Sequence, residues 1–368
     1  MIRTLRSMDW VLLTCLLCLA VLGMITLYAA VHQGGPGLWQ RQLIFWGLGL
    51  VVLFILCFVP LRILGLSCWP VYLLALLLLI LVPVLGDVQM GARRWLHLGA
   101  FNLQPSEIMK WALMLVMANW FASREARSAV DLSFALLLFV TPAALIVNQP
   151  DLGTTLVILF ATTAMLIAAG LPWRWFGMAV IAAFAAVPAL WHFMHGYQKK
   201  RVLTLLDPQS DPLGAGYHVI QSTIAIGSGG LFGKGFLQGT QARLHFLPEQ
   251  HTDFIFSVLA EEGGFIAVSL LLLLYAILIT RILVISQRAH SRFASLICIG
   301  VASIFMLYIV VNIGMVSGLL PVVGLPLPFI SYGGSALVTM LAALGLVMRV
   351  VIESKESIPW QRPGSSLA

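Results

Sequence analysis

Long apolar runs recur along the whole 368-residue chain and constrain its fold more than any other feature. One of them, VYLLALLLLILVPVL at residues 71–85, contains no charged side chain. Crossing the roughly 30 Å hydrocarbon layer of a bilayer takes about 20 apolar residues of helix, and the chain has about ten such runs. They cover residues 9–31, 42–60, 62–85, 106–122, 131–148, 153–171, 174–195, 254–285, 294–318 and 333–352. The sequence therefore predicts an all-α polytopic membrane protein with about ten transmembrane helices.

Composition and the spacing of the runs indicate one membrane domain. Hydrophobic residues make up 60% of the chain and charged residues only 10%, which excludes a soluble multidomain protein. The first run is longer than the roughly 7–15 apolar residues of a secretory signal, so we expect it to remain as the first span. We treat residues 1–368 as a single transmembrane domain.

Basic residues are concentrated in the connections on one side of the predicted spans. The positive-inside rule places that side, and with it both termini, in the cytoplasm. The residues are Arg3, Arg6, Arg62, Arg124, Arg127, Arg174, Arg281, Arg288, Arg292, Arg349, Lys355 and Arg362. The formal net charge of +7 is a consequence of this topology, and no basic stripe indicates a nucleic-acid partner.

The connections on the outer side are longer and carry most of the unusual residues. The longest is an extracytoplasmic loop over about residues 196–253, in which residues 215–227 are predicted to form an amphipathic helix at the membrane interface. A glycine-rich stretch with Lys234 follows, GSGGLFGKGFLQG, but it lacks the spacing and the Ser or Thr of a phosphate-binding loop. We expect its glycines to give the backbone a tight path, near a ligand.

The stretch GMVSGLLPVVGLPLPFISYGGSA, residues 314–336, contains Pro321, Pro326 and Pro328 and no charge. It cannot form a regular helix, and non-helical backbone at membrane depth must be buried in protein or line a cavity. An ordinary apolar loop is the alternative. We favour a re-entrant loop that covers a cavity.

Carboxylates gather where the long outer loop gives way to the eighth predicted span, in LPEQHTDFIFSVLAEEGGF. Asp253 directly precedes the apolar run, so helix capping and catalysis are both open interpretations. Glu261 lies two turns further along the expected helix, about 12 Å deeper at 1.5 Å per residue, with Ser257 between them on one inward face. At least one of Glu261 and Glu262 should be paired or protonated.

A second polar group surrounds the start of the fourth span. Arg93 and Arg94 lie in the preceding outer connection, and Glu107 and Lys110 have the i,i+3 spacing of a helical ion pair. The alternative is that Glu107 suits the helix dipole and Lys110 reaches up to the interface. At the next outer boundary, Asp151 is best explained as a helix cap. One face of the membrane thus carries carboxylates and cations, a pattern that suits a lipid-linked, negatively charged substrate.

Several long stretches resemble the SEDS family (shape, elongation, division and sporulation proteins), and within it the rod-shape branch. They are GARRWLHLG, QPSEIMK, NQPDLGT, LLDPQSDPLGAGYHVIQSTIAIGSGGLFGKG, FLPEQHTDFIFSVLAEEGG and NIGMVSGLLPVVGLPLPFISYGGSA. The resemblance covers nearly the whole chain. It implies a bacterial inner-membrane peptidoglycan glycosyltransferase that polymerises lipid II during cell elongation. It also implies a class B penicillin-binding protein and other elongation-complex membrane proteins as partners.

The resemblance also implies roles for single residues. Asp253 corresponds to the essential carboxylate of the family, Glu107 and Lys110 to its polar pair, and Arg93 and Arg94 to its outer basic residues. Asp253 is then the expected catalytic base. The expected substrate-binding residues are Arg93, Arg94, Glu107, Lys110, Lys234 and Glu261.

Cations would neutralise the diphosphate leaving group, and a divalent cation, Mg or Mn, could bridge it to the carboxylate. No organic cofactor is expected. Two rival functions remain open at this point: a lipid II flippase and a non-catalytic scaffold for the penicillin-binding protein. The first would need a polar path through to the cytoplasmic side, whereas the polar residues here concentrate at the outer rim.

Overall fold

The predicted spans form helices that together build one bundle. The computed structural model describes residues 7–32, 37–89, 92–98, 101–194, 196–211, 214–243 and 250–356. Each predicted run coincides with one helix. The helices are α2 (Trp10–Val31), α3 (Gly37–Phe58), α4 (Leu61–Leu85), α5 (Pro105–Trp120), α6 (Ala129–Asn148), α7 (Leu152–Ala168), α8 (Trp173–Phe193), α12 (Ile255–Gln287), α13 (Arg292–Val316) and α14 (Gly334–Glu356).

Length and composition make most of these helices membrane-spanning. Among the described residues, 7 helices are long and apolar enough to cross a bilayer, and α7 and α8 contribute shorter apolar helices. The helix α5, with 16 residues, is also short, and it carries the Glu107–Lys110 pair in its first turns. The prediction of a polytopic helical membrane protein is confirmed.

Side-chain caps fix the start of several helices. Asp9 accepts a hydrogen bond from the backbone N–H of Leu12 at the start of α2, and Ser291 accepts one from Ala294 at the start of α13. Asp151 caps α7 by accepting from the N–H of Thr154, as its position before an apolar run predicts. These caps satisfy N–H groups that would otherwise be unpaired at the helix ends.

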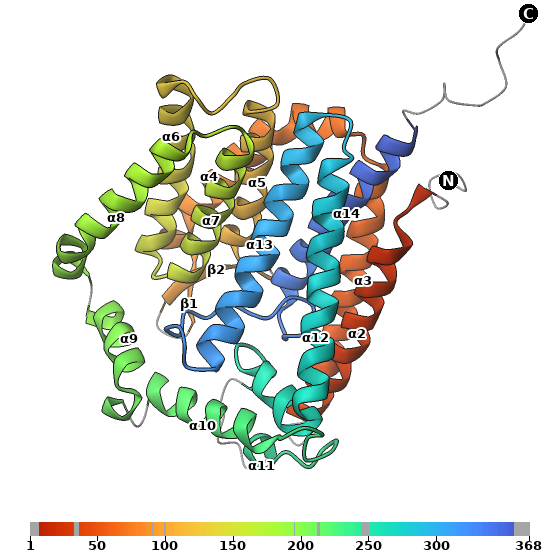
Figure 1. Ribbon diagram of the computed structural model, residues 1–368, viewed down its shortest axis with the longest axis vertical. Coiled ribbons are helices and arrows are strands. Elements are labelled where there is room, and N and C mark those ends of the chain that lie inside the picture. Colours follow the sequence, from red (N-terminus) through yellow and green to blue (C-terminus); the bar gives the residue numbers. More distant parts are fainter. Residues whose placement is uncertain are drawn as a thin grey trace, which may run out of the picture.

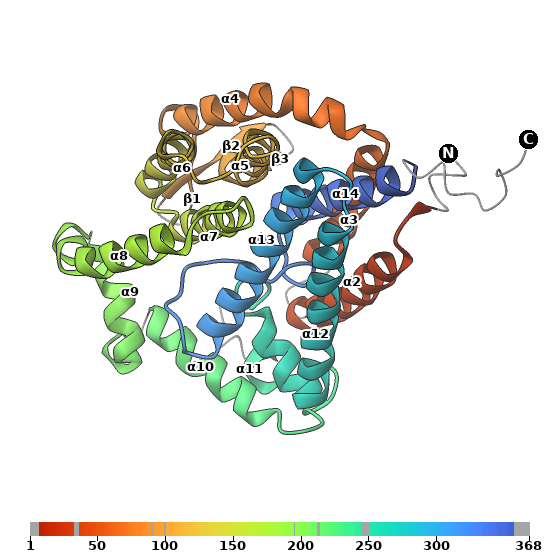
Figure 2. The ribbon, with the colours of Figure 1, turned by 45° about the horizontal axis from the view of Figure 1, so that its top comes forward.

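The bundle is built around α13. Figure 2 shows α13 between α7 on one side and α12 and α14 on the other, and its side chains are mostly buried. The helix α8 extends away from the bundle, and most of its described side chains are exposed. The helix α2 begins and α14 ends on the same upper side of Figure 1, opposite the helices of the long loop.

The long loop is itself largely helical. It contains α9 (Gly196–Leu206), the 3₁₀ turn η1 (Pro208–Ser210), α10 (Ala215–Ser228) and α11 (Thr240–Arg243), which lie together at the lower end of Figure 1. The helix predicted at residues 215–227 is α10. Its buried side includes Val219, Ser222 and Ala225, and the hydroxyl of Ser222 donates to the carbonyl of Val316 at 2.6 Å. This contact ties α10 to the end of α13.

A small antiparallel sheet was not predicted. Its strands β1 (Asp87–Gln89), β2 (Ala92–Leu98) and β3 (Phe101–Leu103) lie in the connection between α4 and α5 and pair in the order β1-β2-β3. The strands are only three to seven residues long. The sheet holds Arg93 and Arg94 on a strand next to the start of α5.

The 33-residue helix α12 is longer than one membrane crossing, and it breaks at Gly264. Gly264 has φ 64° and ψ −164°, a backbone conformation open essentially only to glycine. The break leaves helical hydrogen-bonding groups free, and the glycine-rich stretch pairs with them. The N–H groups of Lys234 and Gly235 donate to the carbonyls of Glu261 and Glu262, while Phe265 and Ile266 donate to residues 230 and 231.

This arrangement explains the glycines of the loop. A Cβ at Gly233 would lie 2.0 Å from the carbonyl oxygen of Glu262, and one at Gly229 would lie 2.0 Å from that of Ala260. The predicted tight backbone path is correct. The partner that the glycines approach in the structure is the broken helix α12.

Candidate active site

The Pro/Gly segment, residues 317–333, runs without regular structure between α13 and α14. Its apolar side chains, among them Leu325, Leu327 and Phe329, are buried. Helix side chains also donate to its carbonyls: the hydroxyl of Tyr275 to Pro328 at 2.6 Å and the amide of Gln42 to Ser331 at 3.1 Å. The part of the segment from Leu325 to Ser331 is therefore largely buried in protein, which favours the re-entrant loop over an ordinary apolar loop.

Asp253 lies against this segment, in the turn that precedes α12. It is partly buried, and its Oδ2 would be 3.3 Å from a Cβ at Gly324. Gly324 has φ 75°, so glycine provides both the space and the left-handed backbone at this point. The amide of Asn312 on α13 donates to the main-chain carbonyl of Asp253 at 2.9 Å.

The interpretation of Asp253 as the N-cap of α12 is wrong. The N-cap of α12 is Phe254, which makes no side-chain cap hydrogen bond. Asp253 stands one residue earlier, outside the position that caps a helix. Its carboxylate lies instead beside Gly324 of the Pro/Gly segment.

Arg93 and Arg94 both bind neutral carbonyl oxygens. Arg93 donates to the carbonyl of Pro83 at 2.9 Å and is exposed, and Arg94 donates to those of Gln149 at 2.9 Å and Pro150 at 2.5 Å. A carbonyl partner fixes the guanidinium but does not cancel its charge, whereas a carboxylate would. Both arginines therefore keep a net positive charge at this end of the bundle.

A series of contacts runs from the loop that Arg94 holds to the part of the Pro/Gly segment that faces Asp253. Gly153, in the first turn of α7 just after the loop that Arg94 holds, packs on the Pro/Gly segment. A Cβ at Gly153 would lie 3.0 Å from the carbonyl oxygen of Val323. The next residue in that segment, Gly324, is the one that faces Asp253. The loop that Arg94 holds is thus followed by a helix turn that packs on the segment next to the residue facing Asp253.

Glu107 and Lys110 form the predicted ion pair, with 2.6 Å between Nζ and Oε1. The Lys110 side chain is completely buried, so the alternative that it reaches the interface is wrong. Tyr308 of α13 contacts the ammonium through its hydroxyl, and Thr339 of α14 donates to Glu107 Oε2 at 3.0 Å. The pair therefore holds α5, α13 and α14 together inside the bundle.

Lys234 and Glu261 form a separate ion pair, with 2.7 Å between Nζ and Oε1. Glu261 also accepts from the N–H groups of Thr240 and Gln241 at the start of α11, and Glu262 accepts from those of Leu237 and Gly239. The prediction that one of the two glutamates is paired is confirmed. Both glutamates anchor the glycine-rich loop. They lie just before the break of α12 at Gly264, so the prediction of one unbroken membrane span through them is wrong.

The predicted site residues thus fall into four groups. Asp253 lies against the Pro/Gly segment, Arg93 and Arg94 hold carbonyls near the ends of α4 and α6, Glu107 and Lys110 are sealed inside the bundle, and Lys234 and Glu261 anchor the loop. Sequence reasoning missed Asn312, Tyr308 and Thr339. An asparagine inside an apolar span was the available signal, because polar side chains in membrane helices are costly.

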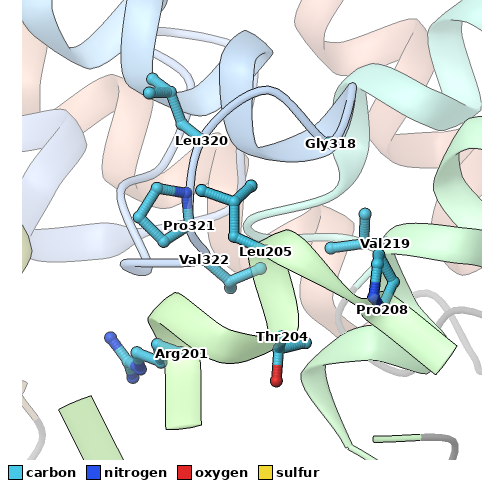
Figure 3. A pocket seen from close by; sticks show the side chains of 9 residues that line it. All are labelled: Arg201, Thr204, Leu205, Pro208, Val219, Gly318, Leu320, Pro321 and Val322. Atoms are coloured by element: carbon cyan, nitrogen blue, oxygen red, sulfur yellow. The ribbon is translucent and has the colours of Figure 1, made fainter. Parts of the chain in front are cut away.

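A narrow cavity separates α9 from the Pro/Gly segment (Figure 3). Its volume is about 10 Å³, which is room for about one water molecule. Its lining is Arg201, Thr204, Leu205, Pro208, Val219, Gly318, Leu320, Pro321 and Val322. The lining is largely apolar and contains no carboxylate, so the cavity lacks the chemistry found at Asp253.

Comparisons with known proteins agree with this architecture. A family model described as FTSW_RODA_SPOVE, cell cycle protein, matches residues 7–356. The chain belongs to the SEDS family. Among its SEDS relatives, the peptidoglycan glycosyltransferase MrdB of Escherichia coli K12 is 46% identical over 346 residues, which cover 93% of each chain. Stage V sporulation protein E of Bacillus subtilis is 35% identical, covering 94% of this chain and 97% of the relative.

Two solved SEDS structures share the fold over nearly the whole chain. One belongs to a peptidoglycan synthase complex that coordinates polymerization and crosslinking; its TM-score is 0.83 at 39% identity, covering 96% of this chain and 99% of that chain. The other is the rod shape determining protein RodA of Thermus thermophilus, with a TM-score of 0.72 at 34% identity, covering 94% and 96%. The bundle and its Pro/Gly segment therefore follow an established SEDS fold.

Proposed function

We propose that this SEDS protein is a peptidoglycan glycosyltransferase that polymerises lipid II, with Asp253 as its general base. The relative MrdB carries the name of that activity. The observation that supports the role of Asp253 most directly is its position: a carboxylate outside the helix cap, held against a charge-free Pro/Gly segment by Gly324 and Asn312. A carboxylate beside a segment without charged side chains can accept a proton from a neutral hydroxyl.

The reaction needs one base and a stabilised leaving group. The 4-hydroxyl of one sugar attacks the anomeric carbon of another, the bond from that carbon to undecaprenyl diphosphate breaks, and the configuration inverts. Asp253 accepts the hydroxyl proton as the new glycosidic bond forms. The diphosphate departs with its electron pair and needs positive charge more than it needs an acid.

Arg93 and Arg94 are the cations best suited to the diphosphate, because their carbonyl partners leave their charge uncompensated. Lys110 and Lys234 each face a glutamate at hydrogen-bond distance, so their charge is already balanced. This refines the expected substrate-binding set. Arg93 and Arg94 contact the leaving group, and the other four residues shape the site without touching it.

A divalent cation, Mg or Mn, fits this scheme only with ligands from the substrate. Among the described residues, no three His, Cys, Asp or Glu side chains lie together, whereas magnesium is often held by one or two carboxylates and substrate phosphates. Asp253 would be the protein ligand. Such a cation would supply further charge neutralisation of the diphosphate.

We further propose that the active site is extracytoplasmic, that both termini are cytoplasmic, and that a class B penicillin-binding protein cross-links the strands. The concentration of basic residues in the connections opposite the long loop supports this orientation. The solved synthase complex that resembles this chain supports a cross-linking partner. A flippase would need a polar path to the cytoplasmic side, and the Glu107–Lys110 pair that would start such a path is sealed by Tyr308 and Thr339.

Polymerisation of lipid II by the purified protein tests the proposal. The assay is run with and without the penicillin-binding partner, in the presence of moenomycin to suppress contaminating transferases of the family-51 type. Glycan strands should form and should lengthen with time. Transport of lipid II across vesicles without any strand formation would favour the flippase, and neither activity would favour the scaffold.

A further inference from the structure

Asn312 is a fully buried polar side chain near the end of the apolar helix α13. Its Nδ2 donates to the main-chain carbonyl of Asp253 at 2.9 Å and to that of Leu325 at 2.7 Å. The two acceptors belong to segments more than 70 residues apart in the sequence. One amide therefore joins the turn that carries the carboxylate to the Pro/Gly segment that faces it.

The orientation of this amide follows from its partners. Both carbonyls can only accept, so the NH₂ group must point at them and both of its hydrogens are used. The Oδ1 atom is then left as the acceptor, and it is buried without a hydrogen-bond partner.

The location of the two hydrogen bonds gives them a specific effect. Leu325 follows Gly324, the residue whose α-carbon faces the Asp253 carboxylate. One NH₂ group holds the carbonyls of both Asp253 and Leu325. It therefore fixes the turn that carries Asp253 and the residues around Gly324 relative to each other. The main chain that carries the carboxylate is thereby held at a fixed place beside Gly324.

We propose that Asn312 is a positioning residue for the transfer reaction, which holds Asp253 at its working distance from the Pro/Gly segment. The proposal rests on the proposed function of Asp253. Asn312 acts through the main chain of Asp253 and leaves the binding of lipid II to other residues. Its loss therefore lowers kcat and leaves KM nearly unchanged, since displacing a catalytic group by about 1 Å costs on the order of 10² in rate.

Two substitutions test this role in the purified full-length protein. Asn312→Asp keeps the shape but replaces the NH₂ group by a second acceptor oxygen, so both N–H donors are lost and an oxygen faces the carbonyls of Asp253 and Leu325. We expect kcat for lipid II polymerisation to fall about 10- to 100-fold. Asn312→Ser keeps one donor and should fall less. KM for lipid II should stay within about threefold in both variants, since the arginines proposed to bind the diphosphate are untouched.

Tyr275→Phe is the matched control. It also removes one buried hydrogen bond from a helix side chain to a carbonyl of the same segment, at Pro328, away from Asp253. We expect it to lower the melting temperature as the Asn312 variants do and to keep kcat. An equal loss of kcat in Tyr275→Phe would overturn the proposal, because the effect would then be loosening of the segment in general.

The variants also distinguish this proposal from the function on which it rests. Strand formation by the unaltered protein establishes the polymerase separately, so an unchanged kcat in folded Asn312→Asp overturns the positioning role alone. If Asn312→Asp fails to insert in the membrane, Asn312→Ser carries the same test. A rise in KM without a fall in kcat would also overturn the proposal, because Asn312 would then bind substrate.

Discussion

At the scale of single residues, the partner of each charged side chain decides what it can do. Sequence reasoning found the cations and carboxylates of the outer end, and i,i+3 spacing was enough to pair Glu107 with Lys110. It could not find that Lys234 pairs with Glu261, since these residues are 27 positions apart and meet only because α12 breaks. It also missed Asn312, whose two acceptors come from distant segments.

The Glu107–Lys110 pair gives a prediction about stability. Lys110→Met keeps the length and the apolar packing of the side chain but leaves Glu107 buried without its cation. Removing one partner of a buried ion pair costs about 3–5 kcal/mol, so the variant should melt well below the unaltered protein. Polymerisation should fall with the amount of folded protein. The measurement is the melting temperature in detergent together with the rate per folded molecule.

The double variant Glu107→Gln with Lys110→Met is the control, because it removes both charges and leaves groups that the hydroxyls of Tyr308 and Thr339 can still reach. It should regain much of the lost stability. A double variant that folds well and polymerises no lipid II would contradict the structural role. Lys110 would then act as a charge near the diphosphate.

At the scale of elements, periodicity and apolar run length predicted every spanning helix, because each must bury its backbone hydrogen bonds internally. The strands β1 to β3 were missed because they are short and lie in a polar connection. The break in α12 was missed because EEGGF lies inside the predicted span at residues 254–285. The donors for the freed carbonyls come from the loop at residues 229–235, which is distant in the sequence.

Gly264 should be intolerant of a side chain. In Gly264→Ala the residue would keep φ 64° with a Cβ 2.2 Å from the backbone nitrogen of Gly233. Backbone strain of this kind costs about 1–3 kcal/mol before the clash is counted. The variant should therefore lose folded protein in detergent. Gly227→Ala is the control: it lies inside α10, nothing would lie within 4 Å of its Cβ, and it should be neutral or stabilise by about 0.5–1 kcal/mol.

At the scale of the whole molecule, the two ends of the bundle carry different parts of the chain. The described part of the chain begins and ends on one side, and the long loop, the small sheet and the start of α12 lie on the other (Figure 1). Sequence reasoning predicted this separation from the distribution of arginine and lysine, which is a property of topology and needs no tertiary structure. The assignment of one end to the outside of the cell is the part that an experiment must decide.

Cysteine labelling checks that assignment. Gln209→Cys lies in the exposed turn η1 and should react with an impermeant thiol reagent added from outside. Gln287→Cys, exposed at the end of α12, should react only after the membrane is opened; the neighbouring Ser286 is unsuitable because it is buried against Ser295. Both variants also carry Cys18→Ser, because Cys18 is exposed and would otherwise be open to the reagent. The other four cysteines are buried. Labelling of Gln287→Cys alone in intact cells would reverse the orientation and place Asp253 in the wrong compartment.

The central claim is that Asp253 is the base of the polymerase, and lipid II polymerisation by purified Asp253→Asn tests it most directly. The substitution keeps nearly the same size, leaves the Phe254 cap untouched and preserves the carbonyl that Asn312 holds, so the variant should fold. An amide cannot accept the sugar hydroxyl's proton, so we expect the rate to fall roughly 10²–10⁴-fold. Near-normal polymerisation by Asp253→Asn would contradict the claim, because the base would then have to be a group other than this carboxylate.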